Sequence, residues 1–152
     1  MVSAQSIKTF FEQPLIAVIG VSRQPLKFSN GVYHILKEKG LNVIPVNPNV
    51  SEIDGDICYD NITTLPFEIP AALILTPASR TDDVVKQAIA KGVKHIWIQN
   101  RAETQSAIDL ALKNGIDIIY KQCILMFAEP VKSIHGFHKF LNRLFGKYPK
   151  GF

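Results

Sequence analysis

Short apolar runs alternate with amphipathic segments along most of the chain. Five runs rich in Ile, Val, Leu and Ala have the length of buried strands; they are residues 15–20, 41–46, 71–76, 95–98 and 116–120. Three segments with helical spacing of apolar residues lie between them, at residues 30–39, 81–91 and 103–114, and each is followed by glycine. Thr81 is the expected N-cap of the second helix, with Asp82 and Asp83 in its first turn.

The apolar runs are mostly continuous and lack the regular in-out alternation of a sheet with one solvated face. Continuous runs are typical of parallel strands that helices cover on both faces. The alternation of strands and helices with short connections therefore predicts an α/β fold with a doubly wound, five-stranded parallel sheet. Residues 50–70 show no regular period, and we expect an irregular connection there in place of a helix.

The net charge of +4 is spread unevenly over the 152 residues. Residues 1–129 have a net charge of −1, whereas residues 130–152 hold five basic residues and no acidic one. The length fits one domain, which we place at residues 1–129, followed by a basic tail at residues 130–152.

The composition excludes several classes of protein. Hydrophobic residues make up 47% of the chain and can bury a core, so global disorder is not expected. No apolar run approaches the length of a membrane span, and the N-terminus lacks the pattern of a secretory signal. Cys58 and Cys123 are too few for a disulfide framework. We therefore expect a cytoplasmic protein.

The first loop at which a doubly wound sheet would bind a ligand is Gly20-Val21-Ser22. Glycine permits a sharp turn there, and the helix that follows presents free N–H groups to a phosphate. A dinucleotide fingerprint would place further glycines where this chain has Ser22 and Pro25. These departures favour a longer, more open phosphate loop, to which Arg23 and Lys27 can supply positive charge.

The end of the second predicted strand gives a second test of the ligand. An NAD site has Asp or Glu at this point to bind the adenosine ribose, whereas this chain has Asn47-Pro48-Asn49 and its nearest acid is Glu52. The two departures count against NAD(H) but still suit a nucleotide-bearing ligand with a different phosphate geometry. A redox regulator that binds NAD(H) is kept as an alternative.

Taken in order, these loops resemble those of the stand-alone CoA-binding domain proteins, which are similar to the CoA-binding domain of the succinyl-CoA synthetase α subunit. The resemblance covers about residues 12–125 and rests on Gly20-Val21-Ser22, Lys27, Pro45-Val46-Asn47-Pro48-Asn49, Thr76-Pro77-Ala78-Ser79, Trp97-Ile98-Gln99 and Cys123. It implies a Rossmann-like domain that binds coenzyme A or an acyl-CoA across the strand ends, in a sensing, buffering or delivery role.

The resemblance also implies the roles of individual residues. The phosphates would be bound by Gly20, Val21, Ser22 and Lys27, and the adenosine end would be bordered by Asn47 and Pro48. The pantetheine channel would be lined by Thr76, Pro77, Ala78 and Gln99. Ala78 and Asn100 depart from the family pattern, which often has proline or glycine at these places.

The chain shows no constellation for catalysis. Cys123 follows the fifth predicted strand, where its thiol would be a weak candidate for thiol or acyl-transfer chemistry, and a small buried residue is the favoured interpretation. Cys58 has a weaker claim. His135 and His138 are three residues apart but have no carboxylate or thiol nearby, so no metal site is predicted. We expect a binding module, with an enzyme that uses Cys123 as an alternative.

The pattern of the basic tail predicts an amphipathic helix. Between residues 133 and 145, the large apolar residues at helical spacing fall on one face and the cations on the opposite face. We expect this helix to pack on its own domain or across a homodimer. An anionic membrane surface or a partner protein is an alternative, whereas nucleic acid is not expected, because no known reading motif is present.

Overall fold

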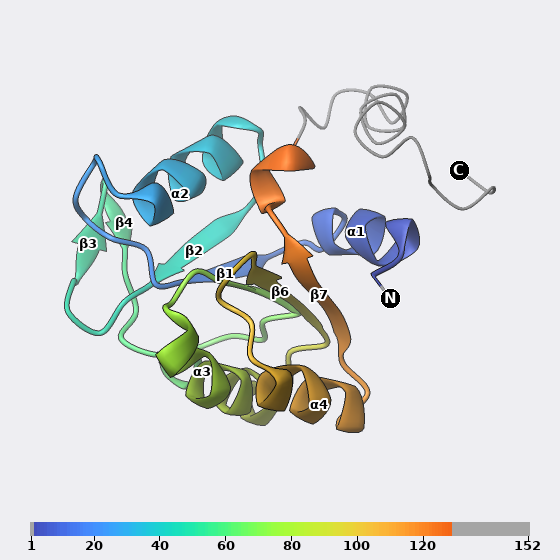
Figure 1. Cartoon of the computed structure of the whole chain (residues 1–152). Coiled ribbons are helices and arrows are strands. Elements are labelled where there is room, and N and C mark those ends of the chain that lie inside the picture. Colours follow the sequence, from blue (N-terminus) through green and yellow to red (C-terminus); the bar gives the residue numbers. More distant parts are fainter. Residues whose placement is uncertain (1, 129–152) are drawn as a thin grey trace.

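The computed structural model describes residues 2–128, which form one three-layered unit (Figure 1). The elements, in chain order, are α1 (Ala4–Phe11), β1 (Ile16–Ile19), α2 (Phe28–Glu38), β2 (Val43–Val46), β3 (Glu52–Ile53), β4 (Asp56–Ile57), the 3₁₀ helix η1 (Ile62–Thr64), β5 (Ala71–Ile74), α3 (Ala78–Lys91), β6 (His95–Gln99), α4 (Gln105–Lys113), β7 (Asp117–Gln122) and the 3₁₀ helix η2 (Ile124–Met126).

The central sheet has five strands in the order β2-β1-β5-β6-β7, and every pair of neighbours is parallel. The prediction of a five-stranded parallel sheet is confirmed. The chain moves outward from β1 to β2 on one side and then from β5 to β7 on the other. The strand order therefore reverses between β1 and β5, where a doubly wound fold binds its ligands.

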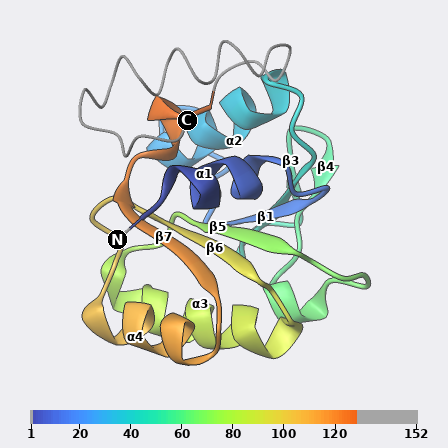
Figure 2. The same ribbon diagram turned by 90° about the vertical axis from the view of Figure 1, so that its right-hand side faces the viewer.

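Helices cover both faces of this sheet, α1 and α2 on one side and α3 and α4 on the other (Figure 2). In β1, Ile16 and Val18 face the core under α1 and α2, while Ala17 and Ile19 face the core under α3 and α4. All four side chains are buried. Burial on both faces explains why the strands are continuous apolar runs in the sequence.

The sequence pattern predicts no element before residue 15, yet α1 forms there. The Ser3 hydroxyl accepts a hydrogen bond from Ser6 N and caps the helix. Ile7 and Phe10 are then buried on one face, and Phe10 packs edge-on against Trp97 of β6 with 5.4 Å between ring centroids. A two-turn helix at the end of a chain is short for detection by periodicity, and its packing against Trp97 is what holds it in place.

Two sequence predictions need correction. α3 begins at Ala78 after the N-cap residue Pro77, so Thr81 is not a cap. Thr81 lies inside the first turn, fully buried, and its hydroxyl donates to Ala102 O at 2.7 Å. Residues 50–70 are not wholly irregular, because β3 and β4 pair as an antiparallel hairpin. Strands of two residues carry no readable period.

The predicted tail at residues 130–152, with its helix and with His135 and His138, lies outside the described residues, so its placement stays a prediction. Within residues 2–128, no helix is long and apolar enough to cross a membrane. The same residues contain no group of three or more His, Cys, Asp or Glu side chains that could hold a metal ion.

Candidate ligand site at the carboxyl ends of the strands

Gly20 and Thr76 bring the first and third loops of the site into contact, at the place where the strand order reverses. Gly20 has a left-handed backbone (φ 93°), and its N–H donates to Val46 O at 2.9 Å. A Cβ on Gly20 would lie 3.0 Å from Thr76 Cγ2 and 3.1 Å from Thr76 N. Only glycine lets the two loops approach this closely, so Gly20 is required by both its dihedral angle and its neighbour.

The loop between β1 and α2 is held in shape by hydrogen bonds to Ser22. Its N–H donates to Ser29 Oγ at 3.0 Å, and its carbonyl accepts from the buried Asn30 side chain at 2.8 Å. The Ser22 hydroxyl in turn accepts from Gln24 N at 3.1 Å. Sequence reasoning missed the part played by Ser29 and Asn30, although two polar residues at a helix start are a signal of this kind of contact.

Asn47 joins the end of β2 to the same loop. Its amide nitrogen donates to Val21 O at 2.7 Å, and its amide oxygen accepts from Asn49 N at 2.9 Å. Val21 is buried, whereas Pro48 is exposed on the turn. The structure therefore brings the predicted residues Gly20 to Ser22 and Asn47 together, and it gives Asn47 a bracing contact within the loop.

The helices that start at the two central loops differ from the others in their N-termini. α1 and α4 are capped by the side chains of Ser3 and Thr104, whereas α2 and α3 begin after Lys27 and Pro77 with no side-chain cap. Neither α2 nor α3 has an acidic residue in its first turn. Arg80 N already donates to Pro77 O at 2.9 Å, but the N–H groups of residues 28–30 of α2 and of Ala78 and Ser79 of α3 remain for an anion, which the helix dipole also favours.

Thr76 presents a polar atom that no described residue satisfies. The hydroxyl oxygen of Thr76 is buried and has no hydrogen-bond partner among residues 2–128. Thr76 lies two residues after the end of β5, next to the exposed Pro77 and the half-buried Ala78. An orphaned hydroxyl beside two uncapped helix N-termini fits a ligand that has both anionic groups and amides, as coenzyme A does.

The ends of β6 and β7 are tied to each other and to η2. Gln99 is 8% exposed, and its side-chain oxygen accepts from Ile124 N at 3.1 Å. Trp97 Nε1 donates to Gln122 O at 3.0 Å, and Asn100 N donates to the same oxygen. Gln99, which is predicted from the sequence to line the pantetheine channel, lies at the end of β6. Its side chain contacts the residues that follow β7.

Both cysteines are free thiols in the described structure. Cys123 is half-buried at the start of η2, directly after β7. Cys58 is buried behind the turn at the end of β2, and burial raises the pKa of its thiol, which keeps it protonated near neutral pH.

Sequence reasoning missed three further cations near the carboxyl ends of the strands. Arg80 lies in the first turn of α3, Arg101 follows β6, and Lys121 lies at the end of β7, all three exposed. Arg101 (φ 75°) and Lys121 (φ 57°) have left-handed backbones, which is uncommon for residues with long side chains. Their place just beyond strand ends was the signal that the sequence offered.

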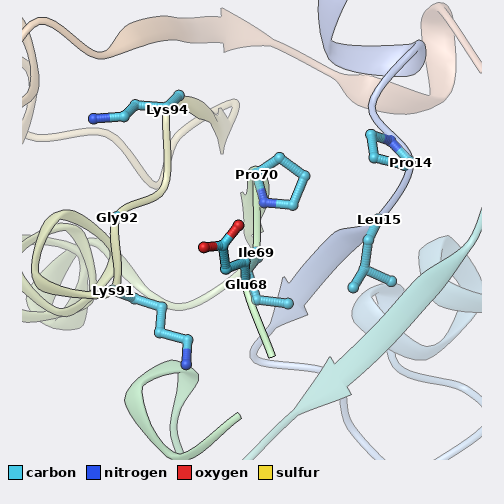
Figure 3. Close-up of a pocket in the computed structure, with 8 residues that line it drawn as sticks. All are labelled: Pro14, Leu15, Glu68, Ile69, Pro70, Lys91, Gly92 and Lys94. Carbon is cyan, nitrogen blue, oxygen red and sulfur yellow. The ribbon is translucent and has the colours of Figure 1, made fainter. Parts of the chain in front are cut away.

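A pocket of about 650 Å³ opens at the opposite end of the sheet (Figure 3). It is lined by Pro14, Leu15, Glu68, Ile69, Pro70, Lys91, Gly92 and Lys94, so it lies where β1, β5 and β6 begin. α3 ends there at Lys91, with Gly92 as its C-cap, and the partial negative charge of a helix C-terminus disfavours phosphate. This pocket is lined by two cations, Lys91 and Lys94, and one acid, Glu68, and it contains none of the predicted site residues.

The comparisons with known proteins agree on one family. The family model "CoA binding domain" matches residues 15–129. The α subunit of the ADP-forming acetate–CoA ligase II of Pyrococcus furiosus is 31% identical over 126 residues, which cover 76% of this chain and 28% of that subunit. An uncharacterized protein of Bacillus subtilis is 23% identical over 109 residues, 72% of this chain and 81% of its own length.

Two solved structures of small proteins have the same fold. A conserved hypothetical protein from Pyrococcus furiosus has a TM-score of 0.71 and 33% identity, covering 74% of this chain and 97% of its own. A hypothetical protein from Pyrococcus horikoshii has a TM-score of 0.75 and 28% identity, covering 93% and 92%. The resemblance to CoA-binding domain proteins is confirmed by these matches. With its family model matched over residues 15–129 and its fold shared with small stand-alone proteins, the chain belongs to the CoA binding domain family.

Proposed function

We propose that this chain binds coenzyme A or an acyl-CoA non-covalently at the carboxyl ends of the strands, over the β1–α2 and β5–α3 loops. Its role would be to sense or buffer CoA, or to deliver it to a partner protein. The observation that carries the proposal is the pair of uncapped helix N-termini, α2 and α3, on either side of the point where the strand order reverses.

The phosphates of CoA supply the negative charge that these helix ends favour. CoA carries a diphosphate and a 3′-phosphate, and each binds best to backbone N–H groups supported by a cation. Lys27 is the exposed N-cap residue of α2, and Arg80 lies in the first turn of α3. We assign Gly20, Val21, Ser22 and Lys27 to phosphate binding, with Arg80 as an added contact.

The remaining parts of CoA have fitting neighbours. The pantetheine arm alternates amides with short apolar links, and Thr76 offers a hydroxyl between Gly20 and the apolar Pro77 and Ala78. The adenosine end would lie by Asn47 and Pro48, where no carboxylate follows β2 directly. Gln99 would act through the residues it braces after β7.

Binding without turnover is the activity that we propose. The chain spans 28% of the acetate–CoA ligase subunit and 18% of a second ligase that it matches. Most of each of those enzymes therefore lies outside the matched region. The free thiols Cys58 and Cys123 are consistent with a cytoplasmic protein. An acyl-transfer role for Cys123 predicts that Cys123→Ser abolishes a turnover, whereas a binding module keeps its CoA affinity after that change.

Titration calorimetry with CoA, acetyl-CoA and NADH tests this proposal. We expect CoA to bind and NADH to bind far more weakly, because no acidic residue is placed to bind the adenosine ribose of NADH. The affinity for CoA should also fall as salt is raised, since phosphate contacts with cations are screened. Tight NADH binding without CoA binding would instead support the redox regulator and overturn the proposal.

Lys27→Ala tests the phosphate end of the site. We expect the affinity for CoA to fall about three- to tenfold, because an exposed cation at a helix N-terminus contributes roughly 1 kcal/mol to an ion pair. Lys39→Ala at the other end of α2 is the matched control and should leave CoA binding unchanged. Equal losses for the two variants, measured by calorimetry at one salt concentration, would argue against a phosphate near Lys27.

A further inference from the structure

The β3–β4 hairpin is fastened to α2 by two carboxylates of its own. Asp54 lies in the hairpin turn, and its Oδ2 is 2.6 Å from His34 Nε2 of α2. Asp56 on β4 accepts a hydrogen bond from the hydroxyl of the buried Tyr33 at 2.6 Å and forms an ion pair with Lys37. These residues, His34 with Asp54 and Asp56 with Tyr33 and Lys37, are called the hairpin clamp below.

The groups around Asp56 favour the protonation states that the clamp requires. Hydrogen bonds from Lys37 and from Tyr33 lower the pKa of the Asp56 carboxyl, so it is ionised throughout the neutral range. Burial and the Asp56 carboxylate raise the pKa of Tyr33, so the phenol remains a donor. The Lys37 ammonium also lies 5.5 Å from the centre of the Tyr33 ring. A buried phenol and an ionised carboxylate in direct contact make this joint specific in geometry.

The hairpin in turn frames the turn at the end of β2. The chain runs from Asn47 through the turn into β3, and after β4 it returns beside the end of β2. Tyr59 N donates to Pro45 O at 3.1 Å, and Asn47 N donates to Tyr59 O at 2.9 Å. Asn47 then reaches the phosphate loop through Val21 O. The hairpin therefore holds the turn at residues 47–49 from its outer side.

α2 is the element that both sides of the site share. Its first turn holds the phosphate loop through Ser29 and Asn30, and its second and third turns hold the hairpin through the clamp. In Figure 1, the hairpin and the start of α2 lie beside the loop that leaves β1. Any displacement of the hairpin from α2 would thus move the turn at residues 47–49 relative to the phosphate loop.

We propose that the hairpin clamp positions the turn at residues 47–49 for the nucleotide end of CoA, so that Asp54 and Asp56 are positioning residues for ligand affinity. This inference rests on the proposed function. The clamp residues need not touch the ligand. The clamp fixes the distance between the turn and the phosphate loop before the ligand binds. Binding therefore costs less entropy, because the two loops are already ordered.

Asp54→Asn and Asp56→Ala test the proposal. Asn tolerates the left-handed backbone of position 54 (φ 52°), so Asp54→Asn removes the charge facing His34 without straining the turn. Asp117→Asn is the matched control, because Asp117 faces His95 at 3.4 Å in another His–Asp pair where β6 and β7 begin. The ligands are CoA, adenosine 3′,5′-bisphosphate and 4′-phosphopantetheine, measured by calorimetry or by competition.

We expect both clamp variants to bind CoA and adenosine 3′,5′-bisphosphate about three- to fivefold more weakly than the unmodified chain does. Their affinity for 4′-phosphopantetheine, which lacks the nucleotide, should stay within error of the unmodified chain, as should every affinity of Asp117→Asn. Unchanged CoA affinity in the clamp variants would overturn the proposal. An equal loss for 4′-phosphopantetheine would also overturn it, because a general loosening of the fold acts on all three ligands.

Hydrogen exchange on the ligand-free chain separates this inference from the proposed function. The clamp variants should exchange the amides of Asn47 and Tyr59 faster, while amides of β5 and β6 keep their protection. Unchanged exchange at Asn47 and Tyr59 would overturn the clamp even if CoA binds. Failure of the unmodified chain to bind CoA would overturn the proposed function, and the exchange result would still decide whether the clamp holds the turn.

Discussion

Gly20→Ala is expected to lower the free energy of unfolding by about 2–3 kcal/mol and to weaken CoA binding at least about tenfold. Two causes add. Alanine is disfavoured at a backbone φ of 93°, and its Cβ would lie 3.0–3.2 Å from Thr76 and from the backbone of Leu75. Since those contacts include backbone atoms, the β1 and β5 loops must separate by a few tenths of an ångström. That separation changes the shape of the surface where the ligand is proposed to lie.

Gly40→Ala separates the two causes. Gly40 has nearly the same dihedral angle (φ 86°), but a Cβ there meets nothing within 4 Å. Its replacement should cost only the conformational part, about 1 kcal/mol, and should leave CoA affinity unchanged. Urea unfolding and calorimetry on both variants make the comparison. If Gly20→Ala cost no more than Gly40→Ala and still bound CoA normally, the ligand site would not depend on the contact between Gly20 and Thr76.

Thr76→Val is expected to move stability and binding in opposite directions. The Thr76 hydroxyl is buried and has no partner within residues 2–128, so replacing it by a methyl group relieves an unsatisfied polar atom. The ligand-free protein should be as stable as the unmodified one or slightly more stable. CoA, however, would lose a hydrogen-bond partner at the proposed site, and its affinity should fall about tenfold, or roughly 1.4 kcal/mol.

Thr81→Val, in the helix α3 that follows Thr76, is the contrasting substitution. The Thr81 hydroxyl is buried but donates to Ala102 O at 2.7 Å, so its removal leaves that carbonyl without this partner. We expect a loss of about 1–3 kcal/mol in the free energy of unfolding and little change in CoA affinity. Thermal melts give the first quantity and calorimetry the second. A destabilised Thr76→Val protein with normal CoA affinity would remove Thr76 from the site.

The sheet could be predicted from the sequence because its strands are buried on both faces. Ile16 to Ile19 are all buried, and such a run is visible without any structure. α1 and the β3–β4 hairpin were not visible, since a two-turn helix and strands of two residues carry too little periodicity. Thr81 was misread as a cap because a threonine before two acids has the same pattern as a true N-terminus.

The candidate site was predictable by position and less so by contact. Strand ends and the glycine after β1 lead to Gly20, Ser22, Asn47 and Thr76 in any doubly wound sheet. No sequence pattern shows that Gly20 touches Thr76, or that the side-chain amide of Asn47 forms hydrogen bonds with the backbone of Val21 and Asn49. Those contacts depend on how neighbouring loops close over the sheet, which is decided by packing between segments far apart in the chain.

A two-dimensional ¹⁵N–¹H NMR titration with CoA tests the central claim most directly, because it reports on the proposed N–H donors themselves. Amide signals of residues 28–30 and 78–79, at the uncapped starts of α2 and α3, should shift together and saturate with one equivalent of CoA. Amides of Lys91, Gly92 and Lys94, at the pocket in Figure 3, should not move. Shifts confined to that pocket, or none at either helix start, would contradict the account.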